Sequence, residues 1–189
     1  MTITLVEKYN PLWAASFEEI KEYLGIKVSQ SCIRIEHVGS TSIPGMVAKP
    51  IIDLILVIKP RDFGKVKELL ADIGYRHQGD LGIRDREVFE LLNANTKNPI
   101  PKHHLYVCPS NSYELKKETA FRDFLKSNNE YSEQLSKLKW FLAERIITID
   151  RRTWKGKQPF TKESLKLHWE NYFRQTYLRA NIPITAKRQ

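Results

Sequence analysis

The sequence predicts a mixed α+β fold of globular composition, with 41% hydrophobic and 11% aromatic residues among 189. Two hydrophobic strands flank a small loop rich in hydroxyl side chains near residue 40, and helical periodicity precedes them. The last third of the chain has helical periodicity throughout. We therefore expect an α/β core over residues 1–110, a helical C-terminal part over residues 111–180 packed on that core, and a loose basic tail over residues 181–189.

The first half of the chain predicts helix, strand, loop, strand and helix in that order. A helix begins at Asn10, because Asn can cap free backbone amides and the Pro that follows suits the first helical position. Gly25 ends this helix. A strand over residues 31–38 leads into the loop, and the apolar run over residues 51–58 indicates a central strand buried on both faces. Residues 60–74 predict the second helix.

The second half begins with weaker strand patterns. From residue 75 the alternation fades, and residues 79–82 predict a turn. Strands are predicted over residues 86–92 and 103–108. The polar segment 93–101 between them is expected to form a mobile flap.

The last third predicts helices over residues 112–127 and 130–149, then a basic loop over residues 151–159 and a final helix that Thr161 can cap. In the longer helix, the apolar residues expected to face inward recur every three to four positions: Tyr131, Leu135, Leu138, Leu142, Ile146 and Ile149. This spacing is typical of a helix packed along one side.

The charge of the chain points to anionic partners. The formal net charge is +9, and the excess of Lys and Arg gathers in the C-terminal part. A positive field attracts nucleic acid or phosphorylated small substrates, although a solvated basic face explains the same charge equally well. In the basic loop, Trp154 among Arg and Lys side chains suits RNA backbone contact with base stacking, or an ordinary solvated turn.

The sequence has no feature of an exported or membrane-bound protein. The longest apolar run has the length of a strand, short of the roughly 18 residues that a membrane helix needs. The N-terminus lacks the charged start and long apolar middle of a signal peptide. Cys32 and Cys108 are the only cysteines, too few for a disulfide framework or a zinc site. We therefore expect a cytoplasmic protein without a membrane partner.

The loop after the first strand has the composition of a phosphate-binding turn. Gly39 and Ser40 offer unhindered backbone amides and a hydroxyl, which suit phosphate oxygens. Thr41 and Ser42 add two donors, and Lys49 adds a positive charge. A plain tight turn explains the same composition. The loop lacks the Lys-Ser/Thr pair of a P-loop and the Gly-x-Ser-x-Gly of a serine hydrolase, so it belongs to neither class.

Asp53 stands among apolar residues on the second strand. If the loop holds a nucleoside triphosphate, this carboxylate is placed to coordinate Mg²⁺ that bridges the phosphates. Three histidines lie in the same segments. His37 precedes the loop, where it could orient the loop or simply fill space. His103 and His104 open a later strand and point to opposite faces of its sheet, so they cannot share one metal ion, and one of them could face the site.

The centre of the chain resembles the signature of the GrpB family. The residues that carry the resemblance are the run His37-Val38-Gly39-Ser40-Thr41-Ser42-Ile43-Pro44-Gly45 and, after three further residues, Lys49-Pro50-Ile51-Ile52-Asp53. It continues through four other segments: Tyr9-Asn10-Pro11-Leu12-Trp13, Arg86-Glu87-Val88-Phe89, His103-His104-Leu105-Tyr106-Val107 and Phe121-Arg122-Asp123-Phe124-Leu125. The resemblance covers nearly the whole chain in the same order.

This resemblance implies a nucleotidyltransferase-like fold of the DNA polymerase beta superfamily, a short mixed sheet with flanking helices and a helical C-terminal part. In such folds a Gly-Ser motif holds a nucleoside triphosphate. An Asp-x-Asp or Asp-x-Glu pair on the next strand and a third carboxylate from a later strand hold two Mg²⁺ ions. The implied activity is transfer of a nucleotidyl group to a hydroxyl acceptor of unknown identity. Gly39 and Ser40 would hold the phosphates, and Asp53 would be the catalytic metal ligand.

The sequence departs from that pattern at two places. Ile55 stands where the second metal-binding acid is expected, and the strand that begins at His103 offers no third carboxylate. Glu87 and Glu90 on the preceding strand are candidate substitutes, and Lys49 or one of the histidines could compensate for the missing charge. One Asp holds one hydrated Mg²⁺ complex but is a poor clamp for two ions. The alternative function is therefore a protein that binds nucleotides or other polyanions without turnover.

Overall fold

The structure, a computed structural model, describes residues 6–92 and 99–153, with side chains described up to residue 143. The predicted flap falls largely outside these ranges, and the predicted final helix, Trp154 and the basic tail fall wholly outside them. The described residues up to Phe141 belong to one compact unit, and those from Leu142 onward belong to a second. The predicted division of the chain after residues 110 and 180 stays a prediction.

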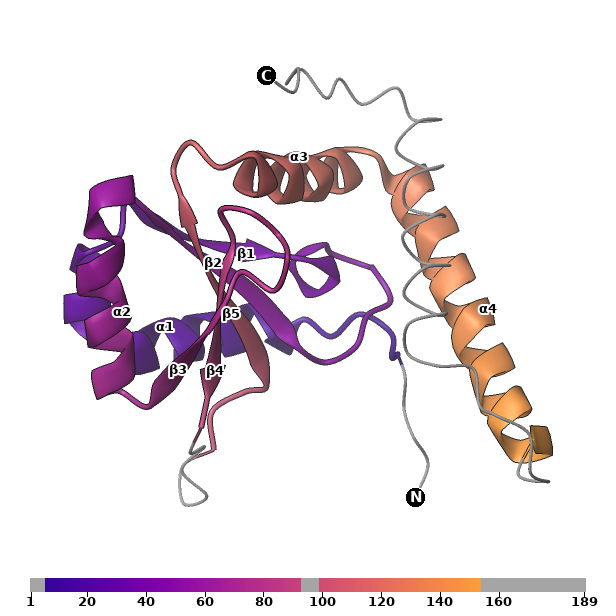
Figure 1. The fold of residues 1–189 in the computed structure, drawn as a ribbon. Helices are drawn as coiled ribbons and strands as arrows, with labels where there is room; N and C mark the ends of the chain where they lie inside the picture. Colours follow the sequence, from indigo (N-terminus) through magenta and orange to yellow (C-terminus); the bar gives the residue numbers. More distant parts are fainter. Residues whose placement is uncertain (1–5, 93–98, 154–189) are drawn as a thin grey trace. The chain divides into compact units, whose positions relative to one another are not determined.

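A five-stranded mixed sheet forms the centre of the first unit (Figure 1), with its strands in the order β1-β2-β5-β4-β3. β2 and β5 pair in parallel, and the other neighbouring pairs are antiparallel. β2 is therefore central, and its residues from Leu54 to Ile58 are completely buried, which confirms the predicted strand buried on both faces. The strands are β1 Arg34–Val38, β2 Ile52–Ile58, β3 Tyr75–Gly79, β4 Glu87–Leu91 and β5 His103–Pro109.

Helices cover both faces of this sheet (Figure 1). α1 (Leu12–Gln30) contacts β1 and β2, and α2 (Phe63–Asp72) contacts β3. α3 (Tyr113–Ser127) contacts β1 and β5 on the opposite face. None of the described helices is long and apolar enough to cross a membrane. The remaining helical elements are α4 (Asn129–Thr153) and two 3-10 turns, η1 (Ser40–Ser42) and η2 (Pro60–Asp62).

The strand register decides which side chains share a face. Register partners lie on the same face, and neighbours along a strand lie on opposite faces. We call one side the α3 face, which carries a small apolar cluster: Val38, Ile55, Val57, Cys108 and Leu115. We call the other the α1/α2 face, whose larger cluster includes Leu54, Leu56, Phe89, Leu105 and Val107. Asp53 is the register partner of Val38 and His104, so it lies on the α3 face.

The N-terminal helix agrees with the prediction except at its end. The Asn10 side chain accepts a hydrogen bond from the Leu12 amide at 3.0 Å, and Trp13 and Phe17 are buried as expected. Helical geometry breaks at Gly25, where φ is +75°, but the chain resumes helical conformation beyond it. The predicted break at Gly25 is therefore confirmed, and the further helical segment up to Gln30 is what the prediction lacks, because a glycine with positive φ interrupts a helix without preventing another helical segment.

The sequence pattern misses β3. The strand reads Arg76, His77 and Gln78 after its buried first residue, and these polar side chains are half-buried or exposed. Because β3 lies at the edge of the sheet, it does not need the apolar alternation by which strands are recognised. The predicted turn at residues 79–82 follows the strand, with positive φ at Gly79 and Gly82.

α4 differs from its predicted inward stripe. Tyr131, expected inside, is 36% exposed, and α4 extends through residues 151–153, which were predicted as the start of a basic loop. Leu135 is buried as predicted, but the other buried positions are small or polar: Ser132, Ser136, Lys139 and Ala143. Ser136 and Lys139 hydrogen-bond to the segment between β1 and β2, so polar contacts set the inward face of α4 near its start.

Candidate functional site

β1 leads into a tight turn over residues 39–42, the Gly-Ser turn, which lies against Asp53. Gly39 has φ +69° and ψ −173°, a conformation that L side chains rarely adopt. A Cβ atom at this position would overlap the Asp53 carboxylate, so the close approach of the turn to β2 requires glycine. η1 follows, and the first backbone amides of a helical turn have no partner within it. The turn therefore brings backbone donors close to a carboxylate.

Buried side chains hold the Gly-Ser turn from inside. The Ser42 hydroxyl donates to the Gly39 backbone oxygen at 2.6 Å, and Thr41 Oγ1 lies 3.0 Å from His37 Nε2. The His37 ring stacks on Phe17 with centroids 4.8 Å apart. Burial lowers the pKa of His37 to about 4, so its imidazole is neutral near pH 7. These residues support the turn, and a phosphate could reach the hydroxyls of Thr41 and Ser42 only by replacing these contacts.

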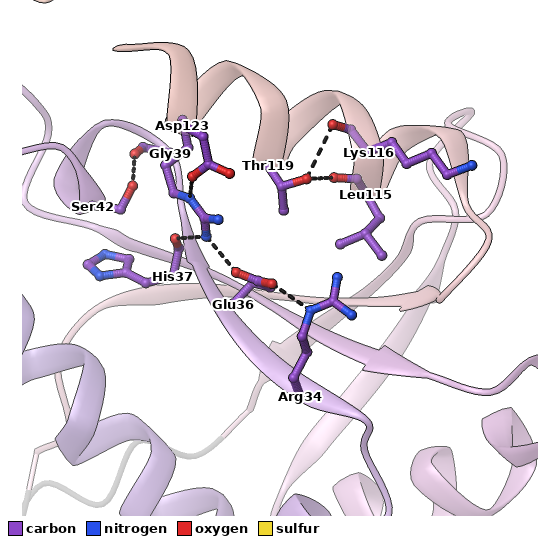
Figure 2. Close-up of polar contacts among 10 residues, drawn as sticks. Arg34, Glu36, His37, Gly39, Ser42, Leu115, Lys116, Thr119 and Asp123 are labelled. Carbon is purple, nitrogen blue, oxygen red and sulfur yellow. Dashed lines mark hydrogen bonds and ion pairs between the residues drawn. The ribbon is translucent and has the colours of Figure 1, made fainter. Parts of the chain in front are cut away.

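An arginine on α3 fixes the end of β1 just before the turn (Figure 2). Arg122 Nη1 donates to Glu36 Oε2 at 2.6 Å and to the His37 backbone oxygen at 3.0 Å. Its Nε donates to Asp123, and Glu36 also accepts from Arg34. The Arg122 side chain is 13% exposed, so these charge-assisted bonds are shielded from water. α3 thus anchors the residues that lead into the Gly-Ser turn.

Asp53 and His104 form a pair on the α3 face. They are register partners on β2 and β5, and His104 Nδ1 lies 2.8 Å from Asp53 Oδ1. This hydrogen bond raises the pKa of His104, while burial and the charge of the exposed Lys49 act in the opposite direction. The side chains of His104 and Asp53 are 53% and 29% exposed, so a ligand can reach both. His103 points the other way, as predicted, and its Nε2 bonds the Tyr75 hydroxyl at 2.6 Å.

A buried lysine reaches the Gly-Ser turn from α4. The Lys139 ammonium donates to the Ser40 hydroxyl and, at 3.2 Å, to the Val47 backbone oxygen. The Ser136 hydroxyl, one turn earlier, accepts from the Val47 amide at 3.1 Å. Lys139 is 6% exposed, and this burial lowers its pKa to about 8 against the opposing charge of Asp53. A cation is therefore held at the hydroxyl that the sequence assigns to phosphate binding.

Three more polar groups gather beside Asp53 on the α3 face. The Arg86 guanidinium lies 4.8 Å from the centroid of the Tyr106 ring, and its buried Nε has no hydrogen-bond partner among the described residues. Glu118, half-buried on α3, interacts electrostatically with Asp53 and Arg86, and burial raises its pKa. Burial and the Asp53 charge raise the pKa of Tyr106 to about 12. The surroundings of Asp53 thus contain a second acid and a guanidinium.

The two glutamates considered as substitutes for the missing acids lie elsewhere. Glu87 is in register with Val107 on the α1/α2 face, and its carboxylate is 2.6 Å from His77 Nε2. Glu90 is exposed on β4 and accepts from Arg76 of the edge strand β3 at 2.9 Å. The structure does not bring either carboxylate together with Asp53.

The donor set fits one magnesium ion and does not fit two. Mg²⁺ is bound through one or two carboxylates, with water and phosphate oxygens in the remaining positions. Asp53 meets this requirement for a single ion. Ile55 is apolar and completely buried. Among residues 6–92 and 99–143, no group of three His, Cys, Asp or Glu side chains could hold a metal ion.

Sequence reasoning gave no role to Lys139, Arg86 or Glu118, because each reaches the site from a distant segment. The sequence carried one signal for Lys139: it follows Leu135 by four residues, so both side chains lie on the same side of a helix, and Leu135 was expected to face inward. Arg86 opens one of the segments that resemble the GrpB family, but nothing local assigns its guanidinium to Asp53. Glu118 is one of several charged residues of α3, and no local pattern singles it out.

Comparison with known proteins agrees with the resemblance. The family model described as GrpB protein matches residues 2–167. The chain belongs to the GrpB family. It is 33% identical to UPF0157 protein BH1888 of Halalkalibacterium halodurans, over 76% of this chain and 70% of that protein. It is 32% identical to UPF0157 protein YqkA of Bacillus subtilis over 82% of this chain, and the match spans 44% of the length of YqkA.

A solved structure of the same family has the same fold. GrpB from Enterococcus faecalis matches 92% of this chain over 99% of its own length, with a TM-score of 0.64 and 25% sequence identity. The predicted fold class, a short mixed sheet with flanking helices, is confirmed. A weaker likeness, with a TM-score of 0.47 at 14% identity, covers 68% of this chain and 39% of Cid1 in complex with a UTP analog. That likeness is too distant to carry a function to this chain.

Proposed function

We propose that this GrpB-family chain binds the triphosphate of a nucleotide at the Gly-Ser turn, with one Mg²⁺ held by Asp53. The observation that carries the proposal is the buried ammonium of Lys139, which donates to the Ser40 hydroxyl. Phosphate oxygens would accept from the backbone amides at the start of η1 and from this ammonium. When bound, the metal ion would neutralise phosphate charge next to Asp53.

Lys139 supports an anionic ligand because its charge is buried without a matching acid. Burying an ammonium costs free energy unless it is paired. Within the described part of the chain, its hydrogen-bond partners are a hydroxyl and a backbone oxygen, and no carboxylate lies within 4.0 Å of Nζ. A purely structural role, tethering α4 to the Gly-Ser turn, would not require a charged side chain. A phosphate at Ser40 would supply the missing negative charge.

Nucleotidyl transfer is the reaction that the resemblance implies, and the donor set supports triphosphate binding more directly. Two-ion transfer relies on several carboxylates that clamp both metal ions around the reacting phosphate. Asp53 is the carboxylate that borders the Gly-Ser turn, and Ile55 offers no oxygen. We therefore propose triphosphate binding ahead of nucleotidyl transfer, and we assign no hydroxyl acceptor.

Calorimetric titration of the full chain with Mg²⁺ and ATP, GTP, CTP or UTP in turn tests the proposal. Lys139→Gln should lower the affinity for the tightest-binding nucleotide by about 10-fold or more, which is the effect expected when a charge-assisted hydrogen bond is lost. The matched control is Lys137→Gln, which removes the same charge from an exposed position of α4 and should change the affinity by less than about 2-fold. Equal weakening by both substitutions, or no binding by the wild-type chain, would overturn the proposal.

Two further variants keep this test decisive if Lys139→Gln lowers stability. Ser40→Ala removes the hydroxyl without burying a new charge, and it should weaken triphosphate binding several-fold. Asp53→Asn should reduce the gain in affinity that Mg²⁺ gives, while binding in the presence of a chelator stays nearly unchanged. Thermal unfolding of each variant shows whether the fold is kept.

A further inference from the structure

We propose that His104 Nε2 is a nucleophile that attacks the α-phosphorus of the bound nucleoside triphosphate and forms a covalent nucleotidyl-histidine. This inference rests on the proposed function, because it needs a triphosphate at the Gly-Ser turn. It names the reactive group at that site and a route of transfer that does not depend on a second metal-binding carboxylate.

The first support is the geometry of the Asp53–His104 pair. The carboxylate of Asp53 accepts from His104 Nδ1 at 2.8 Å, which leaves the lone pair of a neutral imidazole on Nε2. An imidazole that is oriented by a carboxylate through one nitrogen, with the other nitrogen open, has the arrangement required of a histidine nucleophile. The His104 side chain is 53% exposed, so Nε2 is accessible to a phosphate. No hydrogen bond to Nε2 occurs among the described residues.

The second support is the position of the pair next to the Gly-Ser turn. The backbone of Gly39 lies against one oxygen of Asp53, and His104 bonds the other oxygen. Asp53 therefore stands between the predicted phosphate site and the imidazole. A triphosphate that begins at Ser40 would need to extend only past this one side chain to reach His104.

The third support is the charge around the imidazole. Lys49 and Arg86 both act electrostatically on His104, and they belong to different segments of the chain. Arg86 is held over the Tyr106 ring, and its Nε has no hydrogen-bond partner among the described residues. Two cations that act on an open imidazole would draw phosphate oxygens toward it and stabilise the negative charge of the leaving group.

The reaction balances with a nucleoside triphosphate and a hydroxyl compound. A bond forms between Nε2 and the α-phosphorus, and the bond from that phosphorus to the bridging oxygen breaks, with its electron pair leaving on pyrophosphate. The imidazole keeps its Nδ1 proton and becomes positively charged, and the Asp53 carboxylate offsets that charge. An acceptor hydroxyl, or water, then bonds to the phosphorus. The N–P electron pair returns to Nε2, and the hydroxyl proton passes to solvent.

Covalent labelling tests this inference without knowledge of the acceptor. The full chain is incubated with Mg²⁺ and α-³²P-labelled ATP, GTP, CTP or UTP in turn, then denatured in alkali. We expect protein-bound label that is stable in alkali, is lost in mild acid and maps to the peptide containing His104. In His104→Gln the label should fall to background while calorimetry still detects triphosphate binding.

The matched control is His103→Gln, which removes an adjacent imidazole that points to the opposite face and should keep the label. If the loss of the Tyr75 contact unfolds that variant, His77→Gln replaces it as a control. Label that persists in His104→Gln, label from γ-³²P nucleotides alone, or triphosphate binding without any acid-labile label would overturn the nucleophile. Failure of the wild-type chain to bind any triphosphate would instead overturn the proposed function, and the nucleophile with it.

Discussion

Two histidine–carboxylate pairs lie on opposite faces of the same sheet. His104 Nδ1 is 2.8 Å from Asp53 on the α3 face, and His77 Nε2 is 2.6 Å from Glu87 on the α1/α2 face. The contacts are nearly equal, but the side chain of His104 is 53% exposed and that of His77 is 21% exposed. A histidine bound to a carboxylate is therefore not by itself a functional site.

The two histidine–carboxylate pairs differ in what surrounds them. His77 packs against both Phe63 and Phe89, with ring centroids 5.5 and 4.9 Å away, so its ring belongs to an aromatic cluster on the α1/α2 face. His104 instead bonds Asp53, which borders the Gly-Ser turn, and the charges of Lys49 and Arg86 act on its imidazole. We infer that the first pair stabilises the core and that the second belongs to the phosphate site. The following predictions test this difference, from the largest expected effect to the smallest.

Gly39→Ala should have the largest effect, because it breaks the contact between the Gly-Ser turn and Asp53. The new Cβ would overlap the carboxylate, and the residue would also keep an unfavourable φ of +69°. Overpacking costs about 1–3 kcal/mol and positive φ about 1–2 kcal/mol, so the free energy of unfolding should fall by about 3 kcal/mol. Urea unfolding measures this change. Gly82→Ala is the control, since φ is +81° but the added Cβ meets nothing within 4 Å, and it should cost about 1 kcal/mol.

Arg122→Met should separate the anchoring of the turn from the chemistry of the site. The substitution keeps much of the side-chain volume but leaves Glu36 half-buried without its partner on α3. We expect a loss of about 2 kcal/mol in the free energy of unfolding and weaker triphosphate binding, because the end of β1 is no longer held. An unchanged affinity with the expected loss of stability would show that the anchor does not position the turn.

His77→Gln and His104→Gln compare the two pairs directly. The first should lower the free energy of unfolding by about 1–2 kcal/mol, since it disturbs a half-buried hydrogen bond among aromatic rings, and it should leave triphosphate affinity unchanged. The second should change stability by less than about 0.5 kcal/mol, because the side chain is largely exposed. The reverse order of stability losses would contradict the assignment of the two faces.

The smallest predicted effect is a pH dependence that comes from Lys139. Its pKa is lowered to about 8 in the folded chain from an ordinary 10.5. Between about pH 8 and pH 10.5 the Lys139 side chain is protonated in the unfolded chain but largely neutral in the folded chain. This residue therefore makes the free energy of unfolding increase as pH rises through that range. Triphosphate binding needs the ammonium, so affinity should fall over the same range. Calorimetry and unfolding at pH 7 and 9.5 measure both trends, and Lys139→Gln should remove both relative to wild type.

Local patterns predicted the parts of the fold that lie close together in the sequence. The strand patterns on either side of the loop placed Gly39 directly after one strand and Asp53 on the next. Strand alternation placed His103 and His104 on opposite faces. Contacts between distant segments left no such pattern. Lys139 reaches Ser40 across 99 residues.

Edge strands and polar helix faces were the other source of error. β3 lacks apolar alternation because the sheet edge does not demand it, so the strand pattern fades from residue 75 and no strand was predicted there. The inward face of α4 is set by hydrogen bonds from Ser136 and Lys139, which a search for apolar periodicity passes over. The absence of an acid at Ile55 was readable from the sequence. The role of His104, the register partner of Asp53 on β5, became visible only from its 2.8 Å contact with that carboxylate.

The most direct measurement is a crystal structure of the full chain with Mg²⁺ and the triphosphate that binds tightest in calorimetry. We predict phosphate oxygens within hydrogen-bond distance of Lys139 Nζ and of the backbone amide of Ser40, with a single magnesium ion on Asp53 and the remaining phosphates extending toward His104. A triphosphate bound elsewhere on the basic surface, with Lys139 still bonded to Ser40 as it is in the free chain, would contradict the account.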